Sequence, residues 1–122
     1  MKKLVPPIGP YSHAVKAGSF LFVSGQIPVD PTTGKVVEST IEAQTTQVLN
    51  NLEAVLESEG FTLEHVVKTE VYLKNMDDFQ AMNKLYADRF TSPKKPARQA
   101  MQVAKLPLDV LVEISCIASL EK

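Results

Sequence analysis

The sequence predicts an α+β fold in which five strands form one sheet and two helices cover a single face of it. Two observations predict this class. Strand-like alternation of β-branched and aromatic residues recurs along the chain, and helical spacing of apolar residues occurs at residues 41–59 and 79–90. The resulting order is ββαβαββ. Because two helices cover only one face and the strands are apolar on both, we expect another copy of the chain to cover the open face.

The first strands are predicted at residues 12–16 and 20–24, joined by the turn at residues 17–19 as a hairpin. In the second of these strands the apolar residues alternate between faces as Phe20, Phe22 and Leu21, Val23. The first helix is predicted to follow Ser39-Thr40-Ile41-Glu42, which fits a capping box, and to end at Gly60.

A third strand is predicted at residues 66–73 because this segment is rich in β-branched residues. Its alternation places Val67, Thr69, Val71 and Leu73 on one face and Lys68, Glu70 and Tyr72 on the other. The second helix has Asn75 or Asp77 as its candidate cap, and Pro93 and Pro96 close it. Its stripe of Met82, Tyr86 and Phe90 is predicted to lie in the core.

The last two strands are predicted at residues 97–104 and 110–120. In the final strand, Glu113 and Ser115 share a face with Leu111 and Ile117, and the opposite face is apolar. We therefore expect Glu113 to lie on the face that the helices leave open.

The composition indicates an ordinary soluble protein with a single domain, residues 1–122, of which 44% are hydrophobic and 22% charged. The net charge is −1 without a basic stripe, so we expect no nucleic-acid partner. A single cysteine, Cys116, excludes an internal disulfide and fits a reducing compartment. The positive start at residues 1–3 is followed by prolines rather than a signal-peptide core, and no stretch approaches the ~20 apolar residues of a membrane helix. We expect a cytoplasmic protein without a membrane partner.

Arg98 is the most informative residue for function, because it is a lone charge in the strand-like segment at residues 97–104. A guanidinium keeps its charge and therefore needs an acidic partner or an anionic ligand. The nearest downstream acid in a comparably apolar strand is Glu113. On adjacent strands, the two could hold a small carboxylate beside a proton donor. A structural ion pair, or an arginine turned to solvent at a sheet edge, are the plainer interpretations.

Other reactive side chains favour structural roles. Cys116 alternates with apolar residues and is predicted to be buried. His13 and His65 are far apart and lack partners at ligand spacing, so we expect no metal site. Lys94 and Lys95 are typical of a solvated loop.

Short motifs occur along the chain in a specific order: Ile8-Gly9-Pro10-Tyr11-Ser12, Val23-Ser24-Gly25-Gln26-Ile27-Pro28, the spacing of Gln44 and Asn51, Asn83 with Tyr86, Pro96-Ala97-Arg98, Leu106-Pro107 and Val112-Glu113-Ile114. Together they resemble the reactive intermediate deaminase family, called RidA or YjgF. The resemblance runs from about residue 7 to residue 118. It implies a chorismate-mutase-like fold in a homotrimer whose three sheets form a central barrel, with sites in the clefts between subunits.

The resemblance also implies an activity. Members of that family hydrolyse enamine and imine intermediates such as 2-aminoacrylate and 2-iminopropanoate to a 2-keto acid and ammonia, without a metal or an organic cofactor. By motif, Arg98 is expected to clamp the carboxylate of a 2-imino acid and Glu113 to position water or carry a proton. The expected lining of the cleft is Tyr11, Ser24, Gly25 and Asn83.

The chain departs from the family pattern at three positions. Ala100 stands where some members have cysteine, Ser115 where a second acid is common, and His13 where glutamine is frequent. These changes bear on substrate preference more than on the class of reaction. Two alternatives share the fold: a module without catalysis that senses a small carboxylate or makes regulatory or holdase contacts, and a chorismate mutase. The latter would need more cationic side chains around its cleft.

Overall fold

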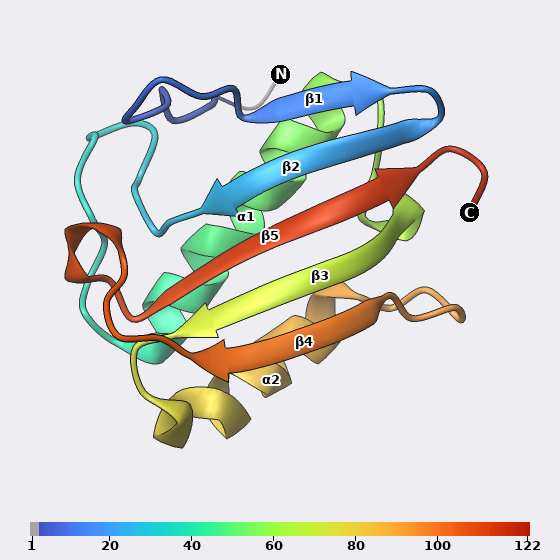
Figure 1. Cartoon of the computed structure of the whole chain (residues 1–122). Coiled ribbons are helices and arrows are strands. Elements are labelled where there is room, and N and C mark those ends of the chain that lie inside the picture. The colour runs from blue at the N-terminus through green and yellow to red at the C-terminus, as the bar shows by residue number, and fades with distance from the viewer. Residues whose placement is uncertain (1–2) are drawn as a thin grey trace.

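A computed structural model describes residues 3–122, so the first two residues of the positive start lie outside the described part. Within residues 3–122, five strands form one sheet and two α-helices lie behind it (Figure 1). The elements are β1 (Ala14–Ala17), β2 (Phe20–Gln26), α1 (Ile41–Ser58), β3 (Val66–Leu73), α2 (Phe79–Arg89), β4 (Ala97–Gln102) and β5 (Val112–Ser119). The predicted α+β class and the order ββαβαββ are confirmed.

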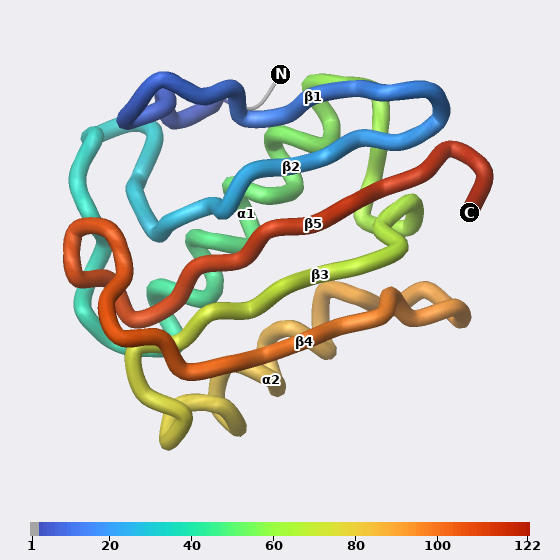
Figure 2. The backbone as a smooth tube through the Cα atoms, in the orientation of Figure 1, coloured from blue at the N-terminus to red at the C-terminus, as the bar shows by residue number. Residues whose placement is uncertain are grey.

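The strands lie in the order β1-β2-β5-β3-β4, so the last strand of the chain is central (Figure 2). Only the β3–β4 pair is parallel among the described strands, and the other neighbours are antiparallel. The crossover through α2 makes the parallel pair possible. The strand order makes β4 an edge strand, and β3 separates it from β5.

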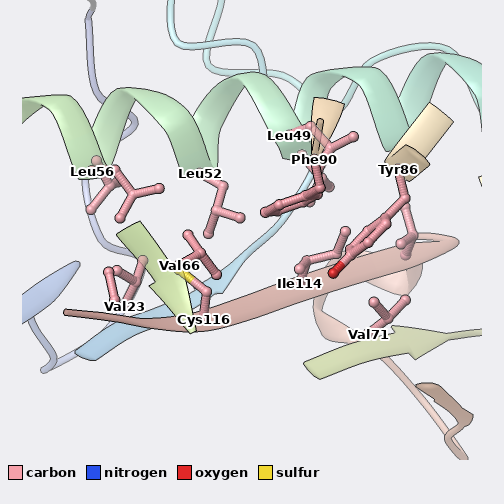
Figure 3. Close-up of a cluster of buried hydrophobic side chains, with 14 of the residues drawn as sticks. Val23, Leu49, Leu52, Leu56, Val66, Val71, Tyr86, Phe90, Ile114 and Cys116 are labelled. Atoms are coloured by element: carbon pink, nitrogen blue, oxygen red, sulfur yellow. The ribbon is translucent and has the colours of Figure 1, made fainter. Parts of the chain in front are cut away.

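The core fills the space between the sheet and the helices (Figure 3). Leu21 and Val23 of β2 are buried in it, whereas Phe20 and Phe22 are 44% and 45% exposed on the opposite face. Met82, Tyr86 and Phe90 of the predicted stripe are buried, as is Cys116. The predicted burial of Met82, Tyr86, Phe90 and Cys116 is confirmed, and so is the predicted division of the β2 residues between two faces. The described part of the chain leaves one apolar face of the sheet uncovered.

The ends of α1 follow from its sequence, with one correction. The helix begins after Thr40, whose Oγ1 accepts a hydrogen bond from the Ala43 amide at 3.1 Å. The capping box predicted over residues 39–42 is wrong, because with Thr40 as the cap Glu42 lies one residue too early to reach back to it. Gly60 ends the helix at φ +80°, a left-handed conformation in which the Phe61 amide donates to Leu56 O.

Two irregularities in pairing shift which residues face the core. Between Val66 and Lys68 the register of β3 against β5 shifts, so Val66 is buried and Val67 is not fully buried. The prediction that Val67 shares a face with Thr69, Val71 and Leu73 is therefore wrong. A second shift lies between Val23 and Gln26, where two residues of β2 oppose one residue of β5.

Other boundaries differ from prediction by a few residues. Asn75 caps a 3₁₀ turn at Met76–Asp78 that leads into α2, its Oδ1 accepting from the Asp77 amide at 2.9 Å. The final strand starts at Val112 because a second 3₁₀ turn, Pro107–Asp109, precedes it. No helix within the described residues is long and apolar enough to cross a membrane.

Candidate active site

Arg98 lies on β4 and points to the side of the sheet that carries α2. It pairs in register with Thr69, a buried residue whose Oγ1 is 2.7 Å from the Tyr86 hydroxyl. Arg98 Nη1 donates to Asn83 Oδ1 at 2.5 Å, and Cζ stands 4.7 Å from the Tyr86 ring centre. Cζ also stands 5.4 Å from the Phe79 ring centre, so one hydrogen bond and two rings fix the guanidinium. Most of its five donors remain available to an anion.

Tyr86 holds this arrangement rigid. It is only 7% exposed, and its ring stacks on Phe90 with centroids 4.3 Å apart. Burial raises the pKa of its phenol, so the ring stays neutral beneath the guanidinium. The helical spacing predicted Tyr86 as a core residue, which it is. Its second role, as the ring against which the Arg98 guanidinium packs, could not be deduced from the sequence, because it depends on β4 lying beside α2.

Beside Arg98 is an open hollow of about 390 Å³, which we call the Arg98 hollow. Its lining residues are Asn83, Tyr86, Ala87, Phe90, Lys95, Pro96 and Arg98. No lining residue is acidic, and two are basic. The Lys95 ammonium donates to Phe90 O at 2.8 Å, and Arg98 adds the planar fork that can bind a carboxylate through two hydrogen bonds. A carboxylate of a small molecule fits this chemistry.

Glu113 lies on β5 and points to the open face of the sheet. It pairs with Tyr72 and alternates with the fully buried Val112 and Ile114. Burial raises the pKa of the Glu113 carboxyl above its ordinary value of 4.5. A carboxyl with a raised pKa is better matched to proton transfer near neutral pH.

The hollow at Glu113, the Glu113 hollow, has a volume of about 400 Å³. It is lined by Gly25, Tyr72, Val103, Lys105, Leu106, Pro107, Glu113 and Ser115. Gly25 lies in the β2 irregularity, and a methyl group there would overlap the Glu113 carboxylate. Gly25 is therefore required for the carboxylate to occupy its position.

The structure does not bring Arg98 and Glu113 together within one chain. Their strands are not adjacent, because β3 lies between them, and their side chains point to opposite faces. Neither takes part in a salt bridge formed within residues 3–122. The expectation of an arginine and an acid on adjacent strands is wrong, and so is the intrachain ion pair. Arg98 does lie at a sheet edge, where its side chain is exposed.

Of the remaining predicted site residues, Asn83 and Gly25 lie at these two hollows, whereas Ser24 and Tyr11 line neither. Asn83 binds Arg98, and Gly25 contacts Glu113. Ser24 lies next to Gly25, and its hydroxyl donates to Ser12 O at 2.7 Å. Tyr11 is 43% exposed on the N-terminal arm and lines neither hollow.

Two side chains near Glu113, Tyr72 and Glu70, were not predicted as site residues from the sequence. The Tyr72 hydroxyl donates to Glu70 Oε2 at 2.7 Å, and both lie on the open face. The alternation of residues 66–73 had placed them together on that face but gave no reason to join them to Glu113. Only the strand order does so, because β3 pairs directly with β5.

The histidines have structural partners. His13 Nε2 contacts Val5 O and Nδ1 lies 3.3 Å from Gln26 Nε2, while His65 Nδ1 accepts from the Thr62 amide at 3.0 Å. Within residues 3–122, no three side chains of histidine, cysteine, aspartate or glutamate come together as candidate metal ligands. Burial raises the pKa of the Cys116 thiol to about 12, which makes it an inert core residue.

Comparisons with known proteins agree with the fold and motifs described above. A family model described as Endoribonuclease L-PSP matches residues 1–120. A RutC family protein of Pyrococcus horikoshii is 56% identical over 92% of this chain and 88% of its own. The 2-iminobutanoate/2-iminopropanoate deaminase of Salmonella typhimurium is 45% identical over 91% of this chain and 88% of its own.

A solved structure gives the same result for the fold. The Rid family protein YyfA of Yersinia pestis superposes with a TM-score of 0.94 at 43% identity, over 98% of this chain and 95% of that one. Fold and motifs thus define a Rid-type α+β protein. The chain belongs to the RidA/YjgF family.

Proposed function

We propose that this protein hydrolyses reactive 2-imino acids, such as 2-iminopropanoate and its enamine tautomer 2-aminoacrylate, to 2-keto acids and ammonia. The observation that carries the proposal is the Arg98 guanidinium, fixed by Asn83 and Tyr86 beside a hollow without acidic residues. Such a group suits a small carboxylate. The Salmonella relative named 2-iminobutanoate/2-iminopropanoate deaminase supports the choice of reaction.

We further propose that the site is complete only between copies of the chain in a homotrimer. Arg98 of one copy would meet Glu113 of the next, because the two point to opposite faces within one chain. The apolar open face supports this arrangement. Val15, Phe20 and Phe22 are 56%, 44% and 45% exposed there, which is unfavourable for an isolated chain in water.

The proposed reaction uses one water and conserves all atoms. Arg98 holds the carboxylate and so fixes the adjacent C=N bond. Glu113 takes a proton from the water while the water oxygen bonds to C2 of the substrate. The C=N electron pair moves to nitrogen. Glu113 then returns that proton to nitrogen. The hydroxyl proton passes by way of Glu113 to the leaving nitrogen as the C–N bond breaks, which yields ammonia and the keto group.

The other predicted residues have positional roles in this proposal. Asn83 orients Arg98, Gly25 admits the carboxylate of Glu113, and Ser24 with Tyr11 lines the cleft once a neighbouring copy closes it. We propose no metal and no organic cofactor, because an imine is already electrophilic and needs only orientation, water and proton transfer. The partners proposed are the 2-imino acid and further copies of this chain, without nucleic acid or membrane.

A second candidate is a module that binds a small carboxylate without turnover. The Arg98 hollow favours it equally, because a sensor needs the same clamp. Glu113 distinguishes the two, because a sensor does not need a half-buried carboxyl with a raised pKa.

The experiment generates 2-iminopropanoate in situ with an amino-acid oxidase and follows its decay with and without the protein. We expect faster decay with the parent chain and with Arg89→Lys, a matched control whose side chain binds Asn50 and approaches Glu53 away from both hollows. Arg98→Lys and Glu113→Gln are expected to be slow. Binding of pyruvate without accelerated decay would favour the sensor. The family model is named for an endoribonuclease, so a short RNA is tested as well. Saturable binding or cleavage of that RNA would overturn both the deaminase and the sensor proposals.

A further inference from the structure

We propose that Tyr72, held by Glu70, provides a second hydrogen-bond acceptor for the hydrolytic water beside Glu113. The proposal rests on the proposed deaminase function and deepens it. Tyr72 pairs in register with Glu113 and lines the same hollow. The Glu113 carboxylate lies near enough to the Tyr72 phenol for its charge to act on it, and both groups line the hollow, so one water there can contact both.

The hydrogen bond to Glu70 determines what the Tyr72 phenol can do. Its single proton is donated to Glu70 Oε2 at 2.7 Å, along the strand and on the same face. The lone pairs of the phenol oxygen can only accept; the Ser115 hydroxyl is placed to donate to one of them, and the other remains for a water. Tyr72 therefore presents an acceptor to the Glu113 hollow, next to the carboxylate that is also an acceptor.

Two acceptors orient a water in a way that one cannot. A water bound by Glu113 alone can rotate about that hydrogen bond, so its lone pairs have no fixed direction. If its other proton is donated to Tyr72, both O–H bonds are fixed and a lone pair is directed at the substrate carbon. Such orientation lowers the entropic part of the barrier.

The opposite role, in which Tyr72 donates its proton to the leaving amine, is disfavoured by the same contacts. Losing that proton would place a phenolate between the carboxylates of Glu70 and Glu113. The pKa of the phenol is raised, first by its hydrogen bond to Glu70, and by burial and nearby negative charge. Tyr72 therefore stays neutral, and Glu113 remains the group that transfers protons.

The test compares Tyr72→Phe, Glu70→Gln and Glu70→Val in the imine-decay assay. Tyr72→Phe keeps the ring and removes the acceptor, so we expect kcat to fall about 5- to 10-fold, the worth of one hydrogen bond, with KM nearly unchanged. Glu70→Gln keeps an acceptor for the Tyr72 phenol, so its kcat should stay close to that of the parent. Glu70→Val removes this acceptor, so its kcat should fall towards that of Tyr72→Phe. The acid limb of the pH profile should not move in any of them, because Glu113 still carries the proton.

The outcomes separate this inference from the function on which it rests. A parent chain that does not accelerate imine decay overturns both. An active parent with unchanged kcat in Tyr72→Phe overturns the role of Tyr72 alone, and so does a changed KM with unchanged kcat. If Tyr72→Phe does not fold, Glu70→Val serves as the test in its place, because the Tyr72 ring is intact in that variant. Parental kcat in folded Glu70→Val then contradicts the proposal.

Discussion

At the scale of single residues, Arg98 and Glu113 have different roles in the proposed reaction, and within one chain each lies in its own hollow. Arg98→Lys keeps the charge but loses the planar fork that binds a carboxylate through two parallel hydrogen bonds. We expect kcat/KM for imine hydrolysis to fall about 10- to 100-fold, mainly through KM. The melting temperature should stay near that of the parent, because Arg98 has an exposed side chain and forms no ion pair within residues 3–122. A stable variant with normal kinetics would contradict the clamp.

The pH profile tests Glu113. As a base it must be ionised, and burial raises its pKa above 4.5, so the protonated, inactive form persists to higher pH than for an exposed glutamate. We expect kcat/KM to fall as pH falls through that raised pKa, with the midpoint of the limb above pH 4.5. Glu113→Gln should remove the limb and lower kcat about 10²- to 10⁴-fold. The matched control is Glu42→Gln on the exposed side of α1, which should leave both unchanged.

At the scale of elements, the turn before β5 holds an unfavourable backbone conformation beside the Glu113 hollow. Leu108 and Asp109 have φ of 55° and 56°, and Leu108 is 61% exposed. The left-handed region costs a leucine about 1–2 kcal/mol, part of which glycine would recover. Leu108→Gly should raise the free energy of unfolding by about 0.5–1 kcal/mol, measured in urea. Activity should fall, because Leu106 and Pro107 of the same segment line the hollow.

A control separates backbone relief from loss of a side chain. Leu120 is 49% exposed, and its φ is not positive. Leu120→Gly should lower the free energy of unfolding, because glycine there only adds freedom to the unfolded chain. Equal destabilisation of both variants would show that the Leu108 turn is not strained.

The elements show how far sequence reasoning extends. Periodicity is a local property, so it predicted both helices and five strands. It could not predict pairing, which depends on contacts far apart in the chain, and so the strands of Arg98 and Glu113 were taken as neighbours although β3 separates them. Val67 was misplaced because a one-residue bulge reverses the alternation on which the prediction depends.

The site shows the same limit. Gly25 and Glu113 were named by motif, and their contact follows from the β2 irregularity, which the sequence does not reveal. Asn83 and Arg98 were also named, and the hydrogen bond between them joins α2 to β4. Tyr72 was missed as a neighbour of Glu113 because no local pattern distinguishes it from other half-buried strand residues.

At the scale of the whole molecule, the uncovered face of the sheet predicts assembly. We expect a homotrimer of three times the 13.4 kDa chain mass at micromolar concentration, measured by sedimentation. Phe22→Glu places a charge on this face and should dissociate the assembly, with activity lost because each site needs two copies. The far-ultraviolet circular dichroism should be retained.

Met76→Glu is the control, because Met76 is 39% exposed in the turn before α2 rather than on the sheet. It should stay assembled and active. A stable parent monomer would contradict the assembly itself, whereas a dimer would contradict only the number of copies and leave the need to cover the face in place.

The central position of β5 has a consequence for the order in which the molecule can form. A chain emerging from the ribosome presents the β1–β2 hairpin long before β5 and completes the β3–α2–β4 unit shortly before it, yet the strands of these two parts meet only through β5. Until residues 112–119 arrive, β2 and β3 each have an unpaired edge rich in apolar side chains. The nascent protein is therefore exposed to aggregation for most of its synthesis. The sheet closes in one late step, which makes non-local pairing the slow part of folding.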